Sequence, residues 1–191
     1  MKKIVAFMLV AAMLLSVTAC GGKANTETTK DDTEGKTCVD ILNDVWAAFP
    51  EDKQFAVSGG DYDHMVDGAA GAVDVTNVEV LDGFLGFPAD SAGMIDEGAC
   101  LMHMMNQNTF TAAVYHVTAA DDVETVADAV KENILNRQWM CGFPDDLVVY
   151  RVGENFLAAA FGKEDNIDEF EDRLQEVFGS AVLLYDEDLN F

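Results

Sequence analysis

Two β-hairpins, each followed by a helix, are predicted in the second half of the chain. Four strand-length apolar runs occur there in two pairs, and a short polar turn separates the members of each pair. Such runs around short turns are typical of β-hairpins, and apolar residues at helical spacing follow each pair. The expected order is hairpin, helix, hairpin, helix and a last strand, over 100–106 and 110–117, 123–134, 147–152 and 156–161, 165–178, and 181–185.

One more helix is predicted before this pattern, over 38–49. Thr37 and Asp40 have the spacing of a capping box, and Pro50 follows the end of the apolar repeat. The next helix has an aspartate form of the same box at 121–124, and Asp165 is expected to cap the last one. Residues 58–98 carry glycine, alanine and aspartate clusters, so we expect loops there, with a short helix in the apolar stretch 78–87.

Together these elements predict the fold class. Hairpins joined by single helices favour an antiparallel or mixed sheet with helices packed on one face, which is a two-layer α+β arrangement. We expect one globular domain over residues 37–191.

The first 20 residues have the layout of a secretory signal. Lys2 and Lys3 precede an apolar stretch at 4–15, and small residues lead to Cys20. The stretch is shorter than the about 20 apolar residues that a membrane-spanning helix needs. Residues 17–20, Val-Thr-Ala-Cys, resemble the lipobox of bacterial lipoproteins, in which the cysteine thiol is acylated and the preceding peptide is removed. An ordinary signal peptide with an incidental cysteine is the alternative.

From this resemblance we expect a lipid-anchored protein on the extracytoplasmic face of a bacterial cell membrane. Residues 1–19 are the expected signal peptide, and Cys20 is the expected acylated N-terminus. Residues 20–36 have no apolar side chain larger than alanine after Cys20, so we expect this segment to be a flexible linker. Two or more acyl chains on Cys20 would hold the protein stably to the bilayer.

The charge of the chain limits its partners. The sequence has 11 basic and 35 acidic residues. Removal of the signal takes away Lys2 and Lys3 and no acidic residue, which leaves 9 basic against 35 acidic residues and a formal net charge of −26. Such a charge repels phosphate backbones and anionic headgroups, so we expect no nucleic-acid partner. Cations, basic peptides or simply water remain as counterparts of the acidic surface.

The second half of the chain also resembles a known family. The hairpin, the segment "DDVETVADAVKENI", the second hairpin with its "VGENFLAAAFG" turn and the closing helix are similar to a domain-of-unknown-function family of small bacterial lipoproteins. The similarity extends over about 84–178. It implies an anchored extracytoplasmic domain and transfers no catalytic residue.

The run from Cys100 to Met105 contains thiol, thioether and imidazole groups, which are ligands of soft copper. Side chains alternate along a strand, so Cys100 and His103 are expected on opposite faces. A turn at 107–108 would place His103 opposite Ala112 and His116 about 13 Å farther along the same face. We therefore expect the methionines to fill the core and no metal to bind here.

Asp61, Asp63 and Asp67 form a carboxylate-rich loop that suggests calcium. The EF-hand pattern fails, however, because Met65 occupies a ligand position and Ala72 stands at the twelfth position. We expect a loop exposed to water, with a looser cation site as the alternative.

Covalent catalysis finds no support in the sequence. No serine lies in a Gly-x-Ser-x-Gly turn, and zinc and phosphate-loop motifs do not occur. Cys141 has no base near it in the sequence. Cys38, Cys100 and Cys141 allow at most one internal disulfide, of undetermined pairing, or three reduced thiols.

Two hypotheses for function follow. The favoured one is a non-enzymatic binding or interaction module, without a cofactor, that is anchored through Cys20 and meets an envelope protein or peptide. The alternative is a small-ligand or metal-binding protein, possibly an enzyme, that uses the Asp61 to Asp67 loop or the face of His103.

Overall fold

The computed structural model describes residues 32–189. The expected signal peptide 1–19, the acylation site Cys20 and most of the linker lie outside these residues. The helices and strands are α1 (Cys38–Ala48), β1 (Val57–Gly59), β2 (Val66–Asp67), β3 (Gly71–Ala72), α2 (Val78–Leu85), η1 (Ala89–Met94), β4 (Ile95–His103), η2 (Gln107–Thr109), β5 (Phe110–Val117), η3 (Ala120–Asp122), α3 (Val123–Leu135), β6 (Asp146–Val152), β7 (Phe156–Gly162), α4 (Glu164–Val177) and β8 (Val182–Asp188).

Within residues 32–189, eight strands form one antiparallel sheet. The strand order is β2-β1-β4-β5-β7-β6-β8, and β3 pairs with β4 beside β1. The two predicted hairpins are β4–β5 and β6–β7, and the second joins the first through β5 and β7. The α+β class and the antiparallel sheet are therefore confirmed.

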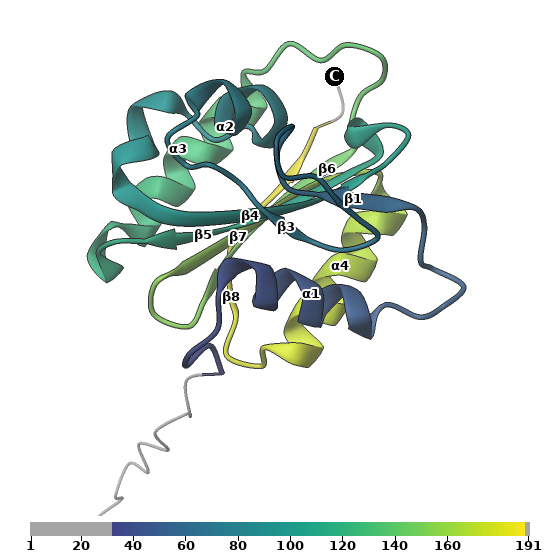
Figure 1. Cartoon of the computed structure of the whole chain (residues 1–191), viewed down its shortest axis with the longest axis horizontal. Helices are drawn as coiled ribbons and strands as arrows, with labels where there is room; N and C mark the ends of the chain where they lie inside the picture. Colours follow the sequence, from purple (N-terminus) through teal and green to yellow (C-terminus); the bar gives the residue numbers. More distant parts are fainter. Residues whose placement is uncertain (1–31, 190–191) are drawn as a thin grey trace, which may run out of the picture.

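The helices, however, cover both faces of the sheet, so the expectation of helices on one face is wrong (Figure 1). Helix α3 links β5 to the parallel strand β6, and α4 links β7 to the parallel strand β8. Both connections move across the sheet in the same direction, but they start from antiparallel strands. Because such crossovers are right-handed, α3 and α4 must lie on opposite faces.

Each face of the sheet has its own apolar core. Helices α1 and α4 pack on one face, where Ile41, Val45 and Phe170 are buried. Helices α2 and α3 pack on the other, where Leu81 and Val130 are buried. All seven residues of β7 are buried, which is expected only for a strand covered on both sides.

The predicted helix starts are partly confirmed. Thr37 and Asp40 form the capping box of α1. The box expected at 121–124 does not form, because η3 leads directly into α3 and Asp122 is already in helical conformation, with no side-chain cap bond. Helix α4 starts one residue before Asp165, so Lys163 occupies its cap position.

The N-terminal side of the sheet differs most from expectation. The short strands β1, β2 and β3 lie where loops were expected, and β4 starts at Ile95 instead of Cys100. The short helix expected within 78–87 is present as α2. Residues 33–36, expected to be flexible, form a turn against the domain. Thr33 is only 4 % exposed, and the Lys36 Nζ lies 2.6 Å from a carboxylate oxygen of Asp44.

No helix within residues 32–189 combines the length and the apolar character required to cross a membrane.

Candidate functional site

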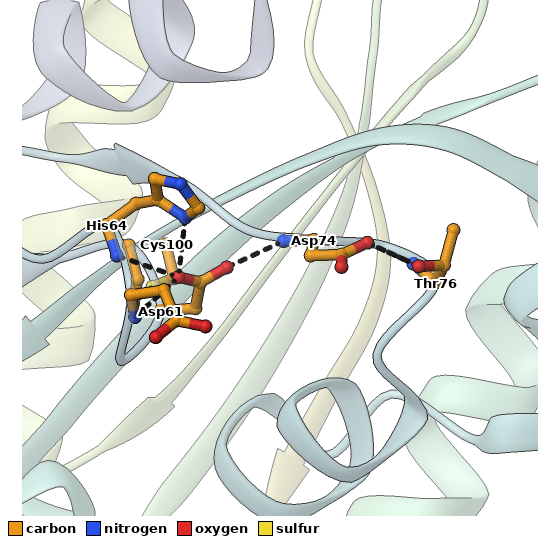
Figure 2. Close-up of polar contacts among 7 residues, drawn as sticks. Asp61, His64, Asp74, Thr76 and Cys100 are labelled. Atoms are coloured by element: carbon orange, nitrogen blue, oxygen red, sulfur yellow. Dashed lines mark hydrogen bonds and ion pairs between the residues drawn. The ribbon is translucent and has the colours of Figure 1, made fainter.

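The carboxylate of Asp61 is the centre of a hydrogen-bonded loop that follows β1 (Figure 2). Its Oδ1 accepts from the backbone N–H groups of Asp63 and His64, at 3.1 and 3.0 Å, and lies 3.0 Å from the Nδ1 of the His64 ring. Its Oδ2 accepts from the backbone N–H of Asp74 at 3.0 Å. Both oxygens are therefore committed to donors of the loop itself.

This geometry changes the interpretation of the three aspartates. Asp61 is 8 % exposed, so the expectation that it lies in water is wrong, whereas Asp63 and Asp67 are exposed as expected. Burial disfavours the charged form of Asp61, but the hydrogen bonds from Asp74, His64 and Asp63 outweigh burial and hold its pKa below the ordinary value. The carboxylate therefore closes the loop through bonds at both oxygens.

The loop borders a pocket of about 430 Å³, which Asp61 and His64 line together with Val66, Ala72 and Val73. Among residues 32–189, no group of three or more histidine, cysteine, aspartate or glutamate side chains is placed to hold a metal ion. The looser cation site that the sequence left open therefore has no support in this loop.

The two histidines considered for copper lie far apart. The β4–β5 register pairs Leu101 with Ala112 and Glu97 with His116, so it differs by two residues from the predicted one. The turn is longer than expected because it includes η2. His103 then lies six residues along β4 from the partner of His116, about 20 Å away, although both occupy the same face as predicted.

Each histidine has local structural partners. His103 stacks on Phe55, with ring centroids 5.0 Å apart, and its Nδ1 accepts from the backbone N–H of Met105 at 3.1 Å. The Nδ1 of His116 lies 2.6 Å from an Asp96 carboxylate oxygen. These contacts position the strand ends and do not assemble a ligand set.

The three cysteines of the described chain are free thiols, so the disulfide left open by the sequence does not form. Cys38 and Cys100 are buried, and burial raises the pKa of both, that of Cys100 to about 12. The Cys100 thiol donates to the carbonyl of Gly60 at 3.4 Å. Cys141 is exposed.

Cys141 belongs to a pocket of about 440 Å³ that sequence analysis did not identify. The pocket lies between the end of α2, the turn that contains η2, and the loop after α3. Its lining includes the exposed side chains of Met105 and Met140, the ring of Trp139 and the amides of Asn106 and Asn108.

Side-chain amides hold the loop that carries this pocket. Asn108 Nδ2 donates to the carbonyls of Met140 and Gly142 at 2.8 and 3.0 Å, and Asn106 Nδ2 donates to the carbonyl of Cys141 at 3.3 Å. Within residues 32–189, Cys141 is the one non-glycine residue with a positive φ, of 64°. The amides thus fix an otherwise unfavourable backbone conformation.

Chemically, the pocket offers thioether, indole and amide groups around one thiol. Met105 and Met140 are 82 % and 80 % exposed and line the same pocket, and exposed apolar side chains that lie together are typical of interaction sites. Arg137 lies over the Trp139 ring, with 4.9 Å between the guanidinium carbon and the ring centroid. Adaptable methionines and a stacked aromatic ring are suited to binding.

The segments that line the pocket and the start of the described chain lie at opposite ends of the sheet (Figure 1). Residues 33–36 line a depression with His116 and Phe156, which are paired at one end of β5 and β7. The turn at 104–109 and the 136–145 loop lie at the other end, where Phe110 pairs with Gly162 and Asp146 pairs with the same glycine.

Comparison with known proteins adds no relative. No family model, curated protein or solved structure matches the chain. The similarity to the lipoprotein family therefore stays a prediction from the sequence.

Proposed function

We propose that this chain is a non-enzymatic binding module, anchored through an acylated Cys20 to the extracytoplasmic face of a bacterial cell membrane. The observation that carries the proposal is the opposite placement of two features. The chain enters the fold at one end of the sheet, and the pocket lined by Met105, Trp139 and Met140 lies at the other.

With a lipid anchor upstream of residue 32, the pocket lies at the end of the domain opposite to the point where the chain enters it. A ligand or protein from the cell envelope could then reach the exposed methionines without contacting lipid. The acidic surface, with a net charge of −24 for the full chain, also favours distance from anionic headgroups.

The Asp61 loop gives no comparable support to the metal-binding alternative. Its single buried carboxylate contacts the loop's own N–H groups and the His64 ring through both oxygens. A cation at Oδ1 would have to displace the bonds from Asp63 and His64.

The anchor is tested by expressing the full chain and its Cys20→Ala variant in a bacterial host. The wild type is expected in the membrane fraction with incorporated labelled palmitate, and the variant is expected unprocessed and without the label. Label on the variant, or a wild type without it, would exclude the lipid anchor.

The orientation is tested through the exposed thiol of Cys141. A membrane-impermeant maleimide should label the wild type on spheroplasts, and Cys141→Ser should remove the label. Labelling only after lysis would place the domain on the cytoplasmic side and overturn the proposal.

A further inference from the structure

Strand β8 is a long free edge of the sheet. Within residues 32–189 it pairs with β6 on one side and with no strand on the other. It has seven residues, so alternate N–H and C=O groups along it face away from β6. Such an edge is able to accept another extended chain. By contrast, the opposite edge strand β2 has only two residues.

The first half of β8 exposes apolar side chains. Val182 is 54 % and Leu183 is 44 % exposed. The register skips one residue where Val149 and Tyr150 pair with Tyr185 and Leu183, so β8 has a bulge at Leu184. The bulge directs Leu184 and Tyr185 toward the α3 core and leaves the flanking side chains at the surface.

Acidic side chains flank this edge on the α3 side. The Tyr185 hydroxyl donates to an Asp128 carboxylate, and Glu124 and Glu132 lie near enough to act on the same phenol. The bond to Asp128, burial and these charges together raise the pKa of Tyr185 to about 12. Two cations also lie on this side. The Nζ of Lys131 is 3.5 Å from Asp128 and 3.9 Å from the centre of the Tyr185 ring, and Arg151, which pairs with Val182, donates to the carbonyl of Glu154 at 2.7 Å.

A second set of carboxylates flanks β8 on the α4 side. Asp186 pairs with Val148, whose side chain belongs to the core under α4, so Asp186 lies on the α4 side of the sheet. The negative charge of Asp186 raises the pKa of Glu171. Asp168 and Asp172 act on Glu171 as well. The cation of this helix, Arg173, is engaged by its own ion pairs, with Glu169 at 3.0 Å and with Glu176.

We propose that a lysine- or arginine-rich polypeptide segment in extended conformation binds the free edge of β8 as an additional strand. Its backbone would pair with the outward N–H and C=O groups of β8, and the apolar side chains on one of its faces would cover Val182 on the α3 side of the sheet. Because successive side chains of a strand point to opposite faces, its alternating basic side chains would lie on the α4 side, beside Asp186 and the carboxylates of α4. This inference rests on the proposed binding function but not on the lipid anchor.

Charge decides between this occupant and a second copy of the chain. Two copies paired through β8 would bring together the acidic flanks of both, in molecules that each carry a net charge of −24. Like charges at an interface oppose association. A basic segment is instead attracted by the carboxylates beside the edge.

The test measures binding of synthetic seven-residue peptides to the full-length chain in detergent, by fluorescence anisotropy. The probe alternates lysine and valine. One control peptide carries glutamate in place of lysine, and a second keeps lysine but carries N-methyl groups at alternate amides. We expect binding of the first probe only. It should weaken when the ionic strength rises from about 0.1 to about 1 M, because the Debye length falls from about 10 to about 3 Å.

Matched variants locate the site. Asp186→Asn should weaken binding about two- to fivefold, and Asp186→Lys should weaken it more. Asp67→Asn, on the opposite edge strand β2, should leave it unchanged. The thermal midpoint of each variant confirms that it is folded.

Three results would overturn the inference. The first is that the N-methylated peptide binds as well as the probe, and the second is that Asp67→Asn weakens binding as much as Asp186→Asn does. The third is a dimer in light scattering that Asp186→Lys disrupts, which would assign the edge to a second copy. None of these results depends on acylation of Cys20, so a failure here is separable from a failure of the anchor.

Discussion

The carboxylate of Asp61 and the backbone N–H of Asp74 are joined by a 3.0 Å hydrogen bond, which ties the two ends of the 61–74 segment together. The same carboxylate also holds the turn at Asp63 and His64. A buried acceptor with this many donors is expected to matter more for stability than for ligand binding.

Asp61→Asn is predicted to destabilise the domain by roughly 1 to 3 kcal/mol at pH 7, because an amide nitrogen would replace one acceptor oxygen and face N–H groups. The pKa of Asp61 lies below its unfolded value of about 3.9. Its contribution is therefore present above pH about 4 and is lost as the pH falls through the folded pKa. Urea unfolding at neutral and acidic pH measures this, with exposed Asp63→Asn as control. A loss of equal size in acid would contradict the explanation.

Gly71 and Gly83 are predicted to respond oppositely to alanine. A Cβ on Gly71 would lie 2.6 Å from the Gly60 nitrogen and 2.8 Å from the Gly59 carbonyl carbon, so Gly71→Ala should cost about 1 to 3 kcal/mol. A Cβ on Gly83, within α2, meets no atom within 4 Å. Gly83→Ala should therefore stabilise by up to about 1 kcal/mol. Thermal unfolding of the two variants checks the pair, and changes of the same sign would be inconsistent with this packing.

Glu171→Gln is predicted to stabilise the domain at pH 7 by roughly 0.5 to 1 kcal/mol. Burial raises the pKa of Glu171, and Asp186, Asp168 and Asp172 add to this, while the hydrogen bond from the Tyr150 hydroxyl opposes it. The folded pKa lies above the unfolded value of about 4.3. The wild type therefore loses stability as the pH rises from the unfolded pKa through the folded pKa.

Glutamine keeps an acceptor for Tyr150 and carries no charge. The gain should therefore vanish below pH about 4, where the wild-type carboxyl is protonated. Chemical denaturation across pH 3 to 8 follows the difference, and a gain that persists in acid would assign it to another cause.

The thiols are predicted to react in two classes. Cys141 is exposed, whereas Cys38 and Cys100 are buried with raised pKa values. Ellman's reagent should modify one thiol of the native acylated protein quickly and all three after denaturation, since the reactive species is the thiolate. A fourth thiol in the denatured mature protein would show that Cys20 is not acylated. Rapid modification of Cys38 or Cys100 in the native state would contradict their burial.

Much of the secondary structure could be predicted because its signals are local. The alternation and length of the runs that became β4 to β7 indicate strands, and the Thr37 and Asp40 capping box indicates the start of α1. The strands β1 to β3 could not be predicted in this way. They have two or three residues each. Strands β1 and β3 are held by pairing with β4, up to 46 positions away in the Val57 and His103 pair, and β2 is held by pairing with β1.

The candidate sites were less predictable for the same reason. The sequence places Asp61, Asp63 and Asp67 in one loop, but burial of Asp61 depends on Asp74 and on the close packing of β1 and β3. The pocket at Cys141 depends on contacts from Asn106 and Asn108, more than 30 positions away. No local pattern contains these contacts.

The sequence by itself determined the helices, the two hairpins, the acidic charge and the expected anchor at Cys20, because periodicity, turn residues and composition act over a few neighbouring residues. Only the tertiary structure decided that helices cover both faces. That outcome follows from β5 and β7 being antiparallel neighbours, which turns two right-handed crossovers to opposite sides of the sheet. The fully apolar "FLAAAFG" run of β7 reflects this burial on both faces, but the strand order was needed to assign its cause.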